Sequence, residues 1–248
     1  MDEIKNYDSL QMYFGEDYII NDFISIRQPT VGDVINMGEQ KYYSTVYLLT
    51  TISSDIKSIL WDMGYDWTEL SDFEMFYLMT RNLNSADTRI FFGDLNLSEF
   101  KMFRRDDGEL LMVNPSNNVT INKYIHFKIS TYLCALHSIK KKPELPGNKH
   151  TKIILIQDDR IKRRAKSDCS YKSQLLPLVS SMVNSAGFKY SINSIKDLKI
   201  YAFMDSVMRV QAIKSADHLT SAYYSGNIDT KKFDTKKLNW LCDLQENK

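Results

Sequence analysis

Apolar side chains recur at helical spacing over much of this chain, and that pattern restricts its fold more than any other feature. One series follows Pro29 and contains Val31, Val34, Ile35, Tyr42, Val46 and Leu49. A second series contains Ile200, Phe203, Met204, Val207, Val210, Ile213 or Lys214, and Leu219, and it ends before Gly226. Both are close to the 3.6-residue period of an α-helix. Glycine and proline, which interrupt helices, number only 9 and 5 in 248 residues, so the sequence favours long helices.

The stretch ISIRQPTVGDVINMGEQKYYSTVYLL, residues 24–49, predicts a strand, a turn and one long helix. Thr30 has the side chain of a helix N-cap, and Asp33 follows three residues later, as in a capping box. Asp33 also brings negative charge to the positive end of the helix dipole. A phosphate-binding loop would need more glycines and a lysine, so we interpret this turn as the start of a helix.

Three further helices are predicted in the N-terminal part. Residues 53–67 suggest a short helix that begins at Ser53 or Ser54 and stops at Gly64. The next helix has Ser71 as its N-cap and Glu74 at the capping-box position. Residues 121–141 then predict a helix with a wide apolar face.

The β-structure that the sequence predicts is small. Residues 18–28 are expected to form one strand, in which Ile24 and Ile26 face the same way. Between residues 98 and 113 the pattern alternates, and Asp107-Gly108 is a strong hairpin turn signal. Val119 and Ile121 add a short edge strand or begin the next helix.

These elements predict a mainly α fold with a minor antiparallel β element, that is, an α+β protein with a helical C-terminal bundle. The expected divisions are a loose acidic lead (1–17), an N-terminal α+β part (18–141), a linker (142–149) and a C-terminal helical part (150–248). Pro143, Pro146 and Gly147 mark the linker. One continuous domain remains the alternative. Within the C-terminal part, Pro177 is expected to interrupt the helix over 171–188.

Charge and cysteine usage limit the classes of function. The formal net charge is +1, whereas non-specific binding to nucleic acid needs an excess of basic residues. The cysteines, Cys134, Cys169 and Cys242, are three in number and far apart, so neither a disulfide framework nor a structural zinc site is expected. The first ten residues lack the apolar stretch of a signal peptide, and no apolar run approaches the length that spans a membrane.

No arrangement of catalytic or metal-binding residues stands out. Cys134 and His137 share one face of a predicted helix, but two ligands do not make a metal site, and packing explains them better. Asp217 and His218 are adjacent, so on a helix they point in different directions. Paired carboxylates occur at 106–107 and 158–159, where a solvated surface explains them. We therefore expect no enzymatic activity, no catalytic residues, no bound metal and no cofactor.

A basic segment, RIKRRAK at residues 160–166, interrupts an otherwise balanced chain. It could contact a phosphate backbone, with Lys140, Lys141 and Lys142 upstream. It lacks interleaved aromatic residues, and acidic residues bracket it. A solvated helix face or an acidic protein partner is the simpler interpretation.

Two groups of aromatic residues are the candidate partner-binding residues. The first is Trp61, Tyr65 and Trp67, which surround Gly64. The second is Tyr223, Tyr224 and Trp240, near the polar C-terminal connection. Aromatic side chains in such places can anchor an interface. The alternative is that they close the core over the ends of helices.

Several longer stretches carry a resemblance when taken together. They are ISIRQPTVGDVINMGE, LWDMGYDW, FFGDLNLSEFKMF, YKSQLLPLVSSMVNSAGFKYS and YAFMDSVMRVQAIKSADHLTSAYYSGNIDTKKF. In them, and over most of the chain from about residue 20 onward, the protein resembles a group of phage and prophage proteins of Gram-positive bacteria, which occur in tail-morphogenesis regions. The first stretch is also similar in style to tail assembly chaperones and to baseplate-hub assembly proteins.

The resemblance implies a protein of the host cytoplasm that binds another phage tail protein, such as the tape measure or a hub component, without enzymatic turnover. Self-association is compatible with it, whereas membrane contact is not expected and nucleic acid is a less favoured partner. The alternative that the resemblance implies is a permanent structural component of the tail or baseplate, located in the virion. A phage-encoded nucleic-acid-binding factor is the third hypothesis.

Overall fold

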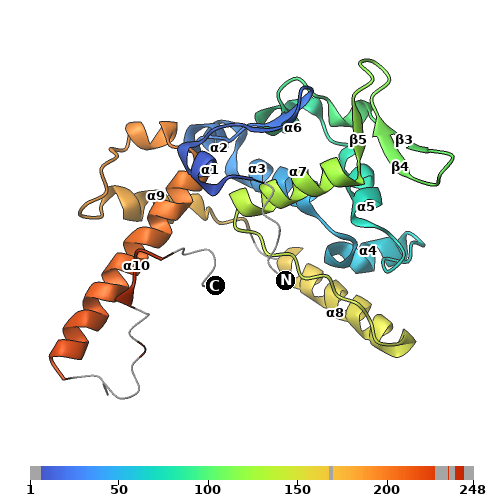
Figure 1. Ribbon diagram of the computed structural model, residues 1–248. Coiled ribbons are helices and arrows are strands. Elements are labelled where there is room, and N and C mark those ends of the chain that lie inside the picture. The colour runs from blue at the N-terminus through green and yellow to red at the C-terminus, as the bar shows by residue number, and fades with distance from the viewer. Residues whose placement is uncertain (1–6, 168–169, 227–233, 235–237, 243–248) are drawn as a thin grey trace.

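The computed structural model describes residues 7–167, 170–226, 234 and 238–242 (Figure 1). Its helices are α1 (Ser9–Phe14), α2 (Val31–Met37), α3 (Glu39–Thr50), α4 (Lys57–Asp62), α5 (Asp72–Thr80), α6 (Ser85–Phe92), α7 (Lys123–Leu136), α8 (Lys149–Ser167), α9 (Leu175–Val183) and α10 (Ile200–Tyr224). Short 3-10 helices are η1 (Ser53–Ile56), η2 (Leu97–Glu99) and η3 (Ser194–Asp197). The strands are β1 (Tyr18–Asn21), β2 (Ile24–Ile26), β3 (Lys101–Arg104), β4 (Leu110–Val113) and β5 (Thr120–Asn122), and they form two small antiparallel sheets. The prediction of a mainly α fold with a minor antiparallel β element is confirmed.

The described N-terminal segment is more ordered than the predicted loose lead. Asp8 caps α1, and Met12 on that helix is only 1% exposed, so α1 is anchored in the core. The single strand predicted over 18–28 is instead the hairpin β1–β2. Asn21 turns the chain, because its Oδ1 accepts hydrogen bonds from the backbone N–H groups of Phe23 and Ile24.

The helix predicted after Pro29 begins where expected but is divided in two. The capping box is confirmed: the Thr30 backbone N–H donates to Asp33 Oδ2 at 2.8 Å, and the Asp33 N–H donates to Thr30 Oγ1 at 3.0 Å. Gly38 has a φ of +89° and separates α2 from α3, a conformation that suits glycine. This break leaves Ile35 51% exposed, although its spacing predicted a buried position.

Removing the N-cap side chain of α2 should lower the stability of the folded chain measurably. We expect Thr30→Ala to lower the free energy of unfolding by about 1 kcal/mol, because the Asp33 N–H loses its acceptor. Thr30→Ser keeps the hydroxyl and should retain most of that stability. Urea unfolding of both variants measures the difference, and equal midpoints would contradict a stabilising role for this hydroxyl.

The β3–β4 hairpin forms where the sequence predicts it, with Gly108 at a φ of +88°, and β5 adds a third strand directly before α7. The capping box of Ser71 and Glu74 at the start of α5 is also confirmed. Helix α6 was not predicted. Asn84 caps it by accepting from the Ala86 N–H, and the helix ends in the buried pair Phe91 and Phe92.

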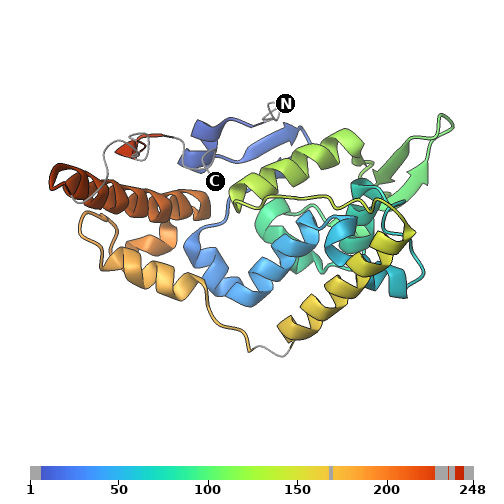
Figure 2. The ribbon, with the colours of Figure 1, turned by 90° about the horizontal axis from the view of Figure 1, so that it is seen from below.

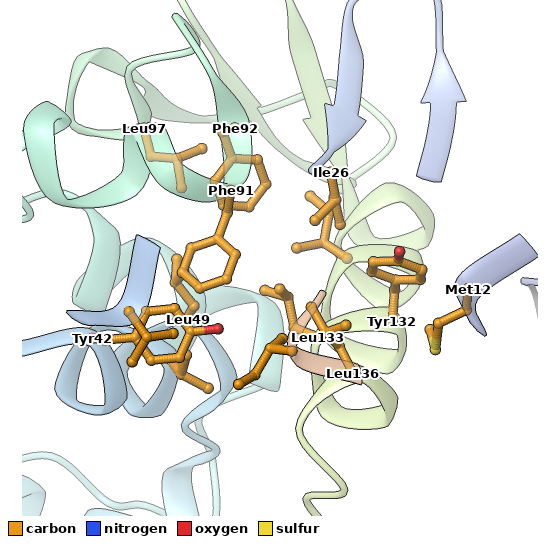
Figure 3. Packing of buried hydrophobic residues seen from close by; sticks show 14 of the residues in the cluster. Met12, Ile26, Tyr42, Leu49, Phe91, Phe92, Leu97, Tyr132, Leu133 and Leu136 are labelled. Atoms are coloured by element: carbon orange, nitrogen blue, oxygen red, sulfur yellow. The ribbon is translucent and has the colours of Figure 1, made fainter. Parts of the chain in front are cut away.

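The main core joins elements that are far apart in the sequence. Figure 3 shows Tyr132 and Leu133 of α7 between Met12 on one side and Phe91 and Tyr42 on the other. The same cluster of buried residues continues into the C-terminal part through Leu175, Met182, Ile195, Ile200, Phe203 and Val207. The boundary at 142–149 stays a prediction, but apolar packing crosses from one side of it to the other.

The regular elements described beyond residue 148 are helical, as predicted, and they lie in two places. Helix α8 runs along α4, while α9 and α10 lie at the other side of the molecule, where α10 projects outward (Figures 1 and 2). Pro177 does not interrupt a helix. It occupies the first turn of α9, where a missing backbone N–H breaks no helical hydrogen bond. Among the described helices, none combines the length and apolar character needed to cross a membrane.

Candidate protein-binding surface

The end of α4 exposes four apolar side chains, which we call the α4 turn surface. They are Ile59, Trp61, Met63 and Tyr65, and between 42% and 65% of each is exposed. The local sequence builds this turn. Gly64 has a φ of +84°, and the Tyr65 backbone N–H donates to the Leu60 carbonyl at 2.8 Å, which closes the helix. The turn therefore holds two aromatic rings and a methionine in a fixed backbone frame.

Trp67 does not belong to this surface. Its side chain is 1% exposed and lies in a second, small core with Ile56, Leu60, Met75 and Ile156. Trp67 thus closes the core beneath the turn, while Trp61 and Tyr65, its neighbours in the predicted group, remain 44% exposed each. The three aromatic residues are close in the sequence, which did not distinguish the buried ring from the exposed ones.

Helix α8 supports the turn from one side through a regular stripe of residues. Lys152, Ile156, Asp159 and Arg163 recur at helical spacing and contact the α4 region. Lys152 forms an ion pair with Asp66 and lies 5.8 Å from the centre of the Trp61 ring. Its hydrogen bond lowers the pKa of Asp66 to about 2. The charged pair thereby fixes a cation against one edge of the α4 turn surface.

Asp159 is the polar centre of the α4–α8 contact and is only 9% exposed. Its Oδ2 accepts hydrogen bonds from the Ser58 backbone N–H at 3.1 Å, the Ser58 hydroxyl at 2.5 Å and Arg163 Nε at 2.9 Å. Burial alone would raise the pKa of Asp159, but these hydrogen bonds lower it below its ordinary value. The ionised carboxylate therefore joins α8 to α4.

The basic segment 160–166 has partners within the same chain. Arg160 pairs with Asp62, Lys162 with Asp158, and Arg163 with Asp159. Arg163 also donates to the Asp55 carbonyl. Three of its cations thus take part in ion pairs with the chain's own carboxylates, which leaves less charge for a phosphate backbone.

The second predicted aromatic group is divided. Tyr223 and Tyr224 form an edge-to-face pair with ring centres 5.5 Å apart, and Tyr224 is 82% exposed. Trp240 is 39% exposed, and its carbonyl accepts a hydrogen bond from Arg209, in the middle of α10. At 1.5 Å per helical residue, Arg209 and Tyr223 are roughly 20 Å apart along the axis. Trp240 and the two tyrosines therefore do not form one site. The two tyrosines belong to α10 and the Trp240 carbonyl contacts it, and α10 lies away from α4 (Figure 1).

The histidine and carboxylate side chains considered in the sequence analysis do not converge on a catalytic or metal site among the residues that the structure describes. His137 is partly buried, its Nε2 lies 2.8 Å from the Tyr42 hydroxyl, and loss of hydration lowers its pKa to about 4. In the described part of the chain, no group of three or more His, Cys, Asp and Glu side chains is placed to hold a metal ion.

A depression of about 460 Å³ lies between α5 and the β3 strand. It includes Arg81, Glu99 and Lys101, which are all exposed to solvent.

Sequence reasoning missed several exposed apolar residues. Ile59 and Met63 belong to the α4 turn surface, and their i, i+4 spacing on either side of Trp61 was the available signal. Leu10, Tyr13 and Phe14 are also exposed, and they have the i, i+3, i+4 spacing of one helix face, opposite the buried Met12. The acidic residues around them had suggested an unstructured lead.

Comparison with known families identifies one part of the chain. Residues 166–245 match the family model of the YomV second domain, a stretch that begins in the last turn of α8 and contains α9, η3 and α10. YomV is a protein of the Bacillus prophage SPβ, so the resemblance to prophage proteins is supported for this stretch. The search of curated proteins found no match, and neither did the search of solved structures.

Proposed function

We propose that this chain is a non-enzymatic protein-binding factor of phage tail or baseplate assembly. The single observation that carries the proposal is the α4 turn surface, where Trp61, Met63 and Tyr65 are exposed together on a backbone frame that α8 supports. Tryptophan and tyrosine are the residues that most often dominate the binding energy of protein interfaces. Methionine adapts to different apolar partners.

The proposed ligand of this surface is an apolar segment of a tail protein, such as the tape measure or a hub component. Partly exposed rings can be covered by the apolar face of a partner helix, which removes them from water. The cation of Lys152 over the Trp61 ring favours a partner with a carboxylate at the rim of its apolar face. The match of residues 166–245 to a domain of a prophage protein supports the phage context.

The experiment is a pull-down from induced lysogenic cells with the tagged chain, followed by identification of the bound proteins. We expect the wild type to retain a tail protein and Trp61→Ala/Tyr65→Ala to lose it, with a fall in affinity of roughly a hundredfold. Phe103→Ala is the matched control, because Phe103 is an aromatic residue that is 51% exposed on the distant β3–β4 hairpin.

Equal retention by the wild type, the double variant and the control would remove the α4 turn surface as the binding site. Mass spectrometry of purified phage particles tests the transient role separately. A chaperone-like factor should be absent from them, whereas stoichiometric presence would instead assign the chain to the tail or baseplate as a permanent component.

A further inference from the structure

We propose that copies of this chain associate head to tail, through contact between its N-terminal surface and the outer face of α8. The N-terminal surface consists of the exposed apolar residues of α1 and the β1–β2 hairpin together with the acidic residues among them. The outer face of α8 consists of exposed isoleucines on a helix with a net positive charge. The two surfaces are opposite in charge and alike in their apolar content.

The N-terminal surface exposes several large apolar side chains within a short segment of the described chain. Between residues 10 and 23, Leu10, Tyr13, Phe14, Ile19 and Phe23 are exposed by 42% to 73%. On α1, Tyr13 and Phe14 also contact each other edge to face, with ring centres 6.0 Å apart. Glu16, Asp17 and Asp22 are exposed around them, and the sequence contains no lysine or arginine between residues 6 and 26.

The outer face of α8 follows from the way that helix is docked. The inner stripe, which includes Ile156 and Asp159, contacts the α4 region. Residues two positions away along a helix are turned by about 200°, so Ile154 and Ile161 point away from α4. They are 50% and 67% exposed. Arg160, Lys162 and Arg164 flank Ile161. The helix carries seven lysine and arginine residues, which outnumber the four carboxylates that pair with them, Asp62, Asp66, Asp158 and Asp159, so its net charge stays positive.

A second copy of the chain is the partner that this pairing of surfaces favours. An acidic surface with aromatic and aliphatic anchors attracts a basic helix with apolar side chains and repels other acidic surfaces. The two surfaces lie on opposite sides of the molecule in both ribbon views, so one chain cannot satisfy its own (Figures 1 and 2). They can meet only between copies.

The geometry of this contact determines the kind of assembly. The two surfaces differ, so the interface is heterologous, and each added copy leaves one free surface at each end. Such contacts form a ring when the rotation between copies closes and a filament when it does not. The contact uses neither Trp61 nor Tyr65, so the inference goes beyond the proposed binding of a tail protein and can fail independently of it.

The first test is the mass of the purified full chain as a function of its concentration, by analytical ultracentrifugation. We expect species larger than a monomer that grow with concentration and dissociate when salt is raised. Salt shortens the reach of charge attraction from about 10 Å at 0.1 M to about 3 Å at 1 M. A monomer at every concentration and salt level would overturn the proposal.

Two variants block one surface each. Phe14→Ser/Asp17→Lys blocks the N-terminal surface, and Ile161→Ser/Lys162→Glu blocks the outer face of α8. Each variant alone should associate at least roughly tenfold more weakly than the wild type. Phe103→Ser/Asp106→Lys changes an exposed phenylalanine and an aspartate on the β3–β4 hairpin, and as the matched control it should associate like the wild type.

Mixing the two blocked variants distinguishes a head-to-tail contact from a symmetric one. The α8 variant retains its N-terminal surface and the N-terminal variant retains its α8 face, so the mixture should form 1:1 dimers and nothing longer. Monomers only, or dimers of a single variant, would overturn the proposal. Unchanged helical circular dichroism in all variants shows that they are folded, and retained binding of the tail protein shows that the α4 turn surface is intact.

Discussion

Lowering the pH from 6.5 towards 4 should reduce the free energy of unfolding by several kcal/mol, mainly because of two histidines that the fold keeps neutral. Burial lowers the pKa of both His126 and His137 from 6.5 to about 4 in the folded chain. In this window the unfolded chain binds protons at both imidazoles and the folded chain does not. Stability is therefore complete above pH 6.5 and falls as the pH approaches 4.

Burial keeps His137 neutral, and its hydrogen bonds determine which ring nitrogen carries the proton. Its Nδ1 lies 2.8 Å from the Leu133 carbonyl, which can only accept, so Nδ1 carries the proton. Nε2 is then the acceptor of the hydrogen bond from the Tyr42 hydroxyl, at 2.8 Å. Protonation of Nε2 would take this acceptor away from the Tyr42 hydroxyl, which stays protonated because burial raises its pKa well above the ordinary value.

His126 is held neutral by apolar packing. It is 7% exposed, and the rings of Phe76 and Phe73 lie 4.8 Å and 5.7 Å from the centre of its imidazole. A charged imidazole would lose its hydration there, because burial disfavours the charged form. At about 1.4 kcal/mol per pH unit, each histidine accounts for about 3 kcal/mol at the lower end of the window.

Urea unfolding at a series of pH values measures this dependence. We expect His126→Leu to flatten the curve between pH 6.5 and 4 by about half, because leucine suits the apolar site and does not titrate. His150→Gln and His218→Gln are the controls, since both histidines are exposed, and their curves should follow the wild type. A wild-type curve that is flat over this window would contradict the burial of neutral histidines. Asp66 and Asp159 have lowered pKa values and lose their contributions only below that range.

The elements that the sequence predicted best are those whose determinants are local. The capping box at Thr30, the hairpin turn at Asp107-Gly108 and the stop of α10 before Gly226 all depend on residues within a few positions of each other. The missed features depend on longer-range packing. Whether Gly38 continues or breaks a helix depends on what both halves contact, and a single apolar period does not reveal that.

The candidate site was predictable in its residue types but not in its exposure. Trp61, Tyr65 and Trp67 read alike in the sequence, and only the packing of α8 on α4 buries Trp67 and leaves the other two exposed. The basic segment was open to several interpretations for the same reason. Its ion-pair partner Asp62 lies about a hundred residues earlier, at a distance in sequence where local patterns carry no information.

Replacing Asp159 with alanine should destabilise the chain by about 3 kcal/mol and release α8 from α4. The substitution removes the acceptor of three hydrogen bonds, from the Ser58 N–H, the Ser58 hydroxyl and Arg163 Nε. Donors left without a partner at a buried site each cost free energy, and the charged donor costs most. The small apolar cluster around Ile156 and the ion pair of Arg160 with Asp62 would then remain between the two helices.

Asp158→Ala is the matched control for this variant. Asp158 is the neighbouring residue, and it pairs with Lys162 at the surface, where the two side chains are 49% and 67% exposed. Exposed pairs of this kind contribute little, so we expect a change below about 0.5 kcal/mol. Urea unfolding measures both variants, and equal losses would contradict the central role of the buried carboxylate.

Hydrogen exchange shows whether the loss of stability in Asp159→Ala is confined to α8. In Asp159→Ala, the backbone amides of α8 should exchange faster than those of α7, because α8 is docked mainly on α4 whereas α7 is embedded in the main core. Released α8 would also withdraw Lys152 from Trp61, so the affinity for a tail protein should fall although neither exposed ring is altered. Wild-type exchange in α8 would mean that its apolar contacts alone keep it docked.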